Sequence, residues 1–230
     1  GAALAAVSLG LGLTSMAGRA GDRLAQAARQ KDGARRRRAP FGPRYVALLL
    51  GVAVPMNATM VIFIWYLTPL MLDGLGQTPS DIVRVLLLYY IAILFIGPQV
   101  AQMADSRPGP VPLVLTGCLV SALALLAPAL IGGYWAIVAA VAGVGVGEVL
   151  TRTPLYSQAL RIAGGPGPGM DTLRLVERLG AIAALFLCAL SLDTLGAAAT
   201  LQLLAGFALV GAAAFASVEF ASKANLTGGE

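Results

Sequence analysis

The sequence contains no histidine and little charge. Only 12% of its 230 residues are Asp, Glu, Lys or Arg, against about 25% in soluble domains. The lack of histidine removes the commonest metal ligand and the usual base near neutral pH. The two cysteines, Cys118 and Cys188, each lie alone in an apolar tract, where helix packing is the expected role. No nucleophile with a neighbouring base is recognisable, so we predict that the chain is not an enzyme and uses no metal or cofactor.

Hydrophobic residues are abundant instead, at 58% of the chain, with a mean hydropathy of +0.81. Six apolar tracts are each long enough to cross a hydrocarbon core of ~30 Å, which takes roughly 20 helical residues. Ala, Leu and Gly dominate them, which favours helices over a barrel of alternating strands. We therefore predict an all-α membrane protein, a polytopic helical bundle. The six predicted full spans are 45–72, 82–104, 111–131, 134–160, 172–192 and 195–218.

The chain divides into four segments. We expect a short partial transmembrane helix at 1–17, a basic cytoplasmic linker at 18–44, the six-helix transmembrane domain at 45–220 and a cytoplasmic tail at 221–230. The six full spans group as three plus three, joined by a tight turn at "GGYW". The first residue is Gly rather than Met, so we expect a fragment or a processed product with a partner segment upstream. We do not expect the first segment to be a signal peptide, because it is rich in glycine and shows no basic leader, although truncation could have removed one.

The distribution of Lys and Arg predicts the orientation. Nine of the sixteen lie within 18–44, whereas the connections 73–81, 132–136 and 193–197 hold none. Because basic residues stay on the cytoplasmic side during insertion, the linker and the C-terminus face the cytoplasm, and we expect a bacterial cytoplasmic (inner) membrane. Arg84 is the exception and is within reach of Asp81. The "RRRR" run is a topology signal that also suits anionic lipid, and no folded basic domain accompanies it to indicate nucleic acid.

A short cytoplasmic loop follows the second full span in the stretch "GPQVAQMADSRPG". Ala101, Asp105, Arg107 and Gly109 in this spacing resemble the loop motif of the major facilitator superfamily. In that family the pattern is Gly, three residues, Asp, Arg, any residue and Gly. In this chain we expect Asp105 to pair with Arg161, since both stand at the cytoplasmic ends of their predicted spans.

The match is incomplete, because Ala101 replaces the first Gly, Ser106 replaces an Arg, and Pro110 stands where a basic residue is usual. The resemblance implies the C-terminal six-helix half of a secondary transporter, preceded by the end of the sixth helix and the central cytoplasmic linker. It also implies a small-molecule substrate and a missing N-terminal half. A rival interpretation remains: "AGRAGDRLAQAARQ" is also similar to the juxtamembrane linker of bacterial sensor proteins, so the upstream part would be a sensing domain.

Ionisable residues inside the predicted spans are the main functional candidates, since each costs about 2.5–3.5 kcal/mol in hydrocarbon and normally faces a partner or a cavity. Glu148 is fourteen residues beyond Tyr134, hence ~21 Å along the helix. Glu177 and Arg178, one to two turns into the next predicted span, should lie at a similar depth in the membrane. The gate or proton-coupling candidates are Glu148, Arg152, Arg174, Glu177 and Arg178. A structural clamp between helices is the equally weighted alternative.

The candidate substrate-cavity residues are Asn57, beside Pro55 in the first full span, and Gln99, after the Gly-Pro break in the second. Proline-broken membrane helices often line cavities, because their freed backbone groups need polar neighbours. The spacing of Gly143 and Gly147 predicts close helix packing. The expected partners are therefore membrane lipid, a small molecule that the sequence does not identify, and the missing upstream part.

Overall fold

The computed structural model describes residues 42–106, 111–163 and 167–227, so the expected segments 1–17 and most of 18–44 lie outside it. The described residues form long helices joined by short turns, and none of them lies in a strand. Five helices are long and apolar enough to cross a membrane. The predicted fold class, an all-α, multi-pass membrane bundle, is thus confirmed.

The first membrane helix runs from Pro43 to Gly74 and changes register along its length. It consists of α2 (Pro43–Leu48), η1 (Leu49–Ala53), α3 (Val54–Thr59), η2 (Met60–Leu67) and α4 (Thr68–Gly74). The two η segments are π-helical, and each ends two residues before a proline, Pro55 or Pro69. A proline has no N–H for the carbonyl four residues earlier, so a wider turn at these points has a local cause. The apolar pattern of the sequence does not predict these segments.

Three more helices follow, α5 (Pro79–Ser106), α6 (Val111–Leu130) and α7 (Tyr134–Ala163). Their bounds lie within about three residues of the predicted spans, as expected from the frayed ends of helices. Gly132 and Gly133 adopt positive φ values of 68° and 81° between α6 and α7. Glycine takes this backbone conformation at little cost, which is why the chain can reverse within so few residues.

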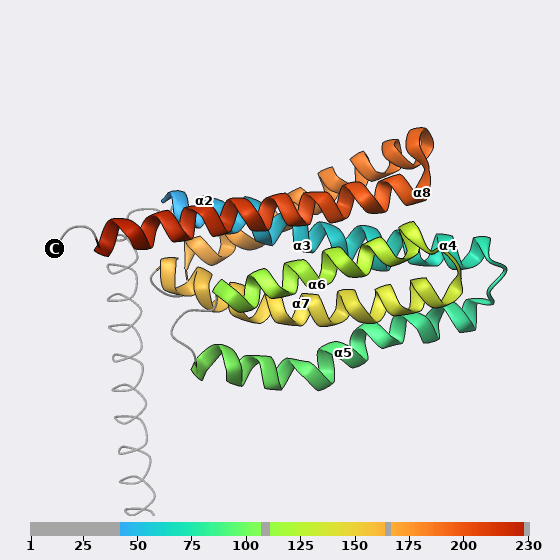
Figure 1. The fold of residues 1–230 in the computed structure, drawn as a ribbon, viewed down its shortest axis with the longest axis horizontal. Helices are drawn as coiled ribbons and strands as arrows, with labels where there is room; N and C mark the ends of the chain where they lie inside the picture. Colours follow the sequence, from blue (N-terminus) through green and yellow to red (C-terminus); the bar gives the residue numbers. More distant parts are fainter. Residues whose placement is uncertain (1–41, 107–110, 164–166, 228–230) are drawn as a thin grey trace, which may run out of the picture. The chain divides into compact units, whose positions relative to one another are not determined.

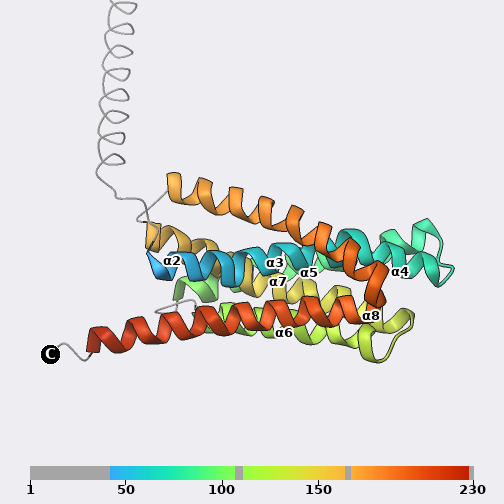
Figure 2. The same cartoon turned by 90° about the horizontal axis from the view of Figure 1, so that it is seen from above.

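The last helix, α8 (Pro168–Thr227), has 60 residues and a single break. Gly196 has φ 80° and ψ 173°, which is not helical, and the chain folds back at this point (Figures 1 and 2). We call residues 168–195 the first arm and residues 197–227 the second arm. The predicted connection 193–197 is thus reduced to one glycine, and the two predicted spans on either side of it are the two arms.

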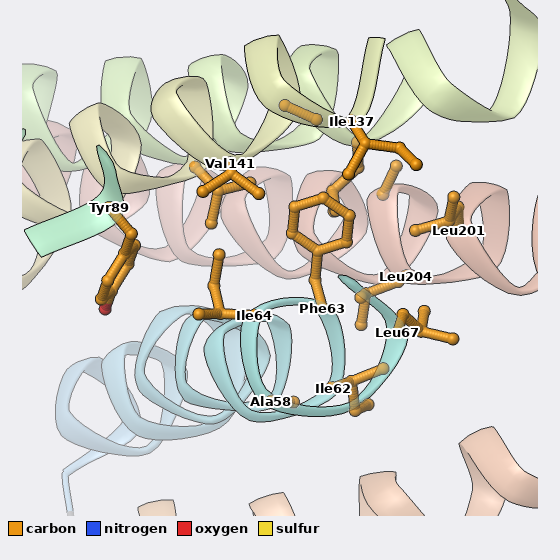
Figure 3. Close-up of a cluster of buried hydrophobic side chains, with 14 of the residues drawn as sticks. Ala58, Ile62, Phe63, Ile64, Leu67, Tyr89, Ile137, Val141, Leu201 and Leu204 are labelled. Carbon is orange, nitrogen blue, oxygen red and sulfur yellow. The ribbon is translucent and has the colours of Figure 1, made fainter. Parts of the chain in front are cut away.

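The first membrane helix lies at the centre of the packing. In its most apolar stretch 72% of residues are buried, against 11% for α5. Its second half supplies Phe63, Ile64 and Leu67 to a cluster that also takes Ile137 and Leu201 from α7 and α8 (Figure 3). Large apolar side chains of this helix are buried against α7 and both arms. Their packing therefore determines the direction in which a polar side chain of the same helix points.

Close backbone approach between α6 and α7 depends on glycine. A Cβ on Gly117 would lie 2.7 Å from the carbonyl oxygen of Gly147, and one on Gly143 would lie 2.7 Å from Cβ of Ala124. Real Cβ atoms essentially never come this close to other atoms, so a larger residue would force the helices apart. The predicted close packing at Gly143 and Gly147 is confirmed, and it holds α7 firmly where the buried charges lie.

Candidate functional site

Glu148 is a buried carboxylate in the middle of α7. Its side chain is only 2% exposed, and Arg152, one helical turn later, places Nε 2.8 Å from Glu148 Oε1. Neither carboxylate oxygen accepts a well-aligned hydrogen bond from the described residues. The contact is therefore a charge pair that leaves much of the hydrogen-bonding capacity of Glu148 open. The predicted i, i+4 pairing is present.

Arg152 also reaches the first membrane helix. Its Nη2 donates to Oδ1 of Asn57 at 3.3 Å, and Asn57 Nδ2 donates in turn to the backbone carbonyl of Glu177 at 2.8 Å. Asn57 lies on α3, the six-residue segment between the two π-helical segments. One amide thus connects α7 with the first arm of α8, and three membrane helices meet at this point.

Glu177 is the second buried carboxylate, with the residue 7% exposed. Its Oε2 accepts a hydrogen bond of 3.1 Å from the hydroxyl of Tyr156. Tyr156 follows Arg152 by one helical turn on α7 and is not among the residues predicted from the sequence. The signal was available, because positions 148, 152 and 156 share one face of a helix.

A small cavity separates these groups. Its volume is about 10 Å³, close to the least space that one water molecule requires. Side chains of α7, the first membrane helix and α8 line it: Ala53, Met56, Asn57, Glu148, Thr151, Arg152, Leu155 and Glu177. We call Asn57, Glu148, Arg152, Tyr156 and Glu177 the polar network. Its two carboxylates and one guanidinium leave one negative charge in excess when both acids are ionised.

The other predicted cations lie outside this network. Arg174 and Arg178 are exposed on the first arm, and neither forms an ion pair with a residue that the structure describes. Arg174 is still close enough to act electrostatically on Glu177 and Tyr156. Arg178 directly follows Glu177, and one residue turns a helix by about 100°, so its side chain leaves the buried face. The predicted cross-helix contact is therefore made by Asn57 and Tyr156 rather than by Arg178.

The remaining predicted residues are not brought to the network. Gln99 is exposed on α5, and Ala101 is half-buried one half-turn later. Arg161 is exposed in the last turn of α7. Arg107, Gly109 and the side chain of Asp105 lie outside the described residues, so the proposed Asp105–Arg161 contact stays a prediction.

A second, half-buried ion pair joins the beginning and end of the described bundle. Arg44 Nε donates to Glu219 Oε2 at 3.0 Å, and Arg44 Nη2 contacts Glu219 Oε1. The Glu219 side chain is 4% exposed and that of Arg44 37%. Next to Arg44, the buried hydroxyl of Tyr45 donates to the carbonyl of Gly169. The first membrane helix is thus fixed to both arms of α8, through contacts that were not predicted from the sequence.

An exposed ion pair stands where α5 begins. Arg84 Nη1 lies 2.9 Å from Asp81 Oδ1, with the Arg84 side chain 78% exposed. Thr78 donates to Asp81 Oδ2 at 2.6 Å. The expected reach of Arg84 back to Asp81 is confirmed.

Comparison with known proteins identifies no relative of this chain. No protein-family model matches the sequence, and a search of curated proteins finds no match.

Proposed function

We propose that the chain is the C-terminal half of a secondary transporter of the major facilitator type. In this proposal it works by alternating access, carries a small molecule and is not an enzyme. The observation that carries the proposal is the polar network, which joins three membrane helices around a cavity about the size of one water molecule. A helix that only anchors a protein needs no buried carboxylate, because each such group costs free energy in hydrocarbon.

The geometry favours a proton as the coupling ion. Glu148 has two carboxylate oxygens without a well-aligned donor, and the cavity beside it is too small for more than about one water molecule. One proton would neutralise the excess negative charge of the network without any new space. Glu148 would take up the proton, while Arg152 gives up its contact with Glu148 and keeps its hydrogen bond to Asn57.

The proposed architecture has six spans in a three-plus-three arrangement, counting the arms of α8 separately. Each arm holds about 30 residues, enough to cross a bilayer at 1.5 Å per residue. The basic linker and the C-terminus face the cytoplasm in a bacterial inner membrane, and an upstream half closes the substrate cavity. Cysteine labelling with an impermeant maleimide tests this arrangement: we expect positions 77–80 to react from outside and 33–39 only from the cytoplasm. The reverse labelling would contradict the proposed orientation.

Proton-coupled transport can be tested in inverted membrane vesicles that contain the complete protein. With an imposed proton gradient, small molecules are screened for dequenching of a pH-sensitive dye. We expect a responding compound with the parent protein, no response with Glu148→Gln, and a normal response with Arg84→Gln as the matched charge control. Coupled transport by Glu148→Gln at the parent rate would remove Glu148 from the coupling role.

The small size of the cavity favours a second candidate, a membrane module of a sensory protein that transports nothing. In this version the polar network is a clamp that packs three helices. It predicts that Glu148→Gln affects activity only as far as it affects stability. Labelling of a cysteine at position 151 separates the two: a transporter exposes it alternately from the two sides, whereas a clamp keeps it inaccessible from both.

A further inference from the structure

A second and larger cavity lies away from the polar network, between the two arms of α8. Its volume is about 350 Å³, within the range of roughly 300–1,000 Å³ that is common for small-ligand sites. The arms meet at Gly196 and diverge from there (Figures 1 and 2). The first membrane helix forms the floor of the cavity through Val54 and Ile62. We call this space the arm pocket.

The lining of the arm pocket is almost wholly apolar. Ala184 and Leu187 of the first arm face Leu203 and Phe207 of the second. Gly180 packs closely against Val54 at the floor, where a Cβ on residue 180 would lie 2.6 Å from Cγ1 of Val54. Leu187 and Phe207 are well exposed, at 65% and 45%, so the pocket is open to the surroundings of the bundle. Since these helices are membrane spans, those surroundings are the hydrocarbon of the bilayer.

Two hydroxyl groups form the polar end of the pocket. Ser191 Oγ and Thr200 Oγ1 lie 3.0 Å apart. Ser191 is also 3.0 Å from the carbonyl oxygen of Cys188, and Thr200 is 2.9 Å from that of Gly196. These three contacts draw on only two hydroxyl hydrogens, so both hydrogens are used within the protein. Each hydroxyl oxygen has two lone pairs, and at most one of the four accepts from the other hydroxyl. The pair therefore presents free acceptors and no free donor.

The position of this hydroxyl pair matches the orientation of a lipid. Ser191 precedes Gly196 by five residues and Thr200 follows it by four, so both lie within ~8 Å of the turn along the helix axis. The turn stands at one end of both arms, where the chain crosses back and where Asp193 and Thr194 are exposed. From there the apolar lining extends to Gly180, eleven residues or ~16 Å from Ser191. A molecule with a polar end at the membrane surface and a tail toward the midplane has the same polarity.

We propose that the arm pocket binds one single-chain amphiphile from the bilayer, whose polar end donates a hydrogen bond to the Ser191–Thr200 pair. A long-chain alcohol or a protonated fatty acid has this chemistry. The tail lies between Leu187 and Phe207 and ends near Val54 and Gly180. The site is separate from the polar network, so the proposal does not depend on transport.

Photolabelling of the complete protein in phosphatidylcholine nanodiscs tests the site. The probes are a long-chain alcohol that carries a diazirine in its tail and the hydrocarbon analogue without the hydroxyl. We expect saturable labelling of α8 peptides on both sides of Gly196, with the alcohol preferred about three- to tenfold, the range that one neutral hydrogen bond supplies. An excess of unlabelled alcohol should remove this labelling.

Three variants make the outcome decisive. Ser191→Ala with Thr200→Val should abolish the preference for the alcohol and leave labelling by the hydrocarbon unchanged. Ala184→Phe, which fills the pocket, should reduce labelling by both probes. Ser217→Ala is the matched control, because its hydroxyl on the second arm donates to the carbonyl of Ala214 and does not line the pocket. Labelling that does not saturate, or that is equal for both probes in the parent, would overturn the proposal even if the filled variant failed to fold.

Discussion

Two ion pairs of similar local geometry stand at opposite extremes of burial. Glu148 and Arg152 are four residues apart on α7, and Asp81 and Arg84 are three apart on α5, with contacts of 2.8 and 2.9 Å. The Glu148 carboxylate is 2% exposed, whereas the Asp81 carboxylate is 33% exposed. Helical spacing explains why each pair forms, but the surroundings decide its energy. A buried ion depends strongly on its partner, while an exposed one can turn to water.

The largest effect should follow from breaking the buried pair. Arg152→Gln leaves Glu148 without a cation in the bundle interior, and we expect a loss of about 3–5 kcal/mol in the free energy of unfolding. Glu148→Gln should cost less, because Arg152 is 38% exposed and keeps its bond to Asn57. The double variant should recover part of the Arg152→Gln loss. Thermal unfolding in detergent measures all three.

Arg178→Gln is the control for this comparison. Arg178 is as close in sequence to Glu177 as any cation, yet it is exposed and outside the network. We expect it to leave stability within about 0.5 kcal/mol of the parent. A loss of stability as large as that of Arg152→Gln would contradict the placement of Arg178 outside the polar network.

The next effect concerns the packing that holds α7 in place. Gly117→Val would put Cβ 2.7 Å from the carbonyl oxygen of Gly147 and 2.8 Å from the Thr151 nitrogen, so we expect a loss of about 3 kcal/mol. Gly206→Ala is the matched control, because nothing lies within 4 Å of its added Cβ. That substitution should be neutral or stabilising by up to about 1 kcal/mol, since alanine is the better helix former. Equal effects in unfolding assays would contradict the close α6–α7 contact.

A smaller effect is expected at the pair between the first membrane helix and the second arm. Glu219→Gln removes the charge that Arg44 contacts twice, but Arg44 is 37% exposed and can reach water. The expected loss is about 2 kcal/mol, the worth of a hydrogen bond to a charged group. Because this pair closes the bundle, hydrogen exchange should rise first near residues 44–48 and 215–221. Exchange that rises equally throughout would indicate that the pair does not act locally.

The smallest effect should come from the exposed pair. Arg84→Gln should change stability by less than about 1 kcal/mol, and the change should shrink further as salt is added. The same salt series should leave the cost of Arg152→Gln nearly unchanged, because buried pairs are screened much less. Equal salt dependence for both substitutions would remove the contrast between the two pairs.

The sequence predicted the long helices well because their signal is local. A run of apolar residues between 111 and 131 or 134 and 160 needs no knowledge of the rest of the chain to be identified. Gly196 was correctly placed within an expected connection, although not as its only non-helical residue. The π-helical segments were missed, because the presence of Pro55 and Pro69 indicates a disturbed register but does not specify its form.

The candidate site was predictable only where its parts are close in sequence. Glu148 and Arg152 share a helix face, so their contact followed from spacing. The contacts of Asn57 and Tyr156 depend on how three helices rotate against one another, so the sequence predicts a substrate cavity for Asn57 and no role for Tyr156. Arg44 and Glu219 are 175 positions apart. A pattern in the sequence could place them at one membrane surface but not in contact.

The separation of partners along the chain also has a consequence for biogenesis. The partners of Asn57 are 95 and 120 residues downstream. They are therefore synthesised about 5–24 s after Asn57, at the usual translation rate of 5–20 residues per second. Meanwhile it exposes only a neutral amide to lipid or to the insertion machinery. Glu148 and Arg152, by contrast, leave the ribosome within about a second of each other and can enter the membrane already neutralised. The interval between synthesis of Arg44 and of its partner Glu219 is the longest of these, but Arg44 lies at the end of its helix, where it can contact water.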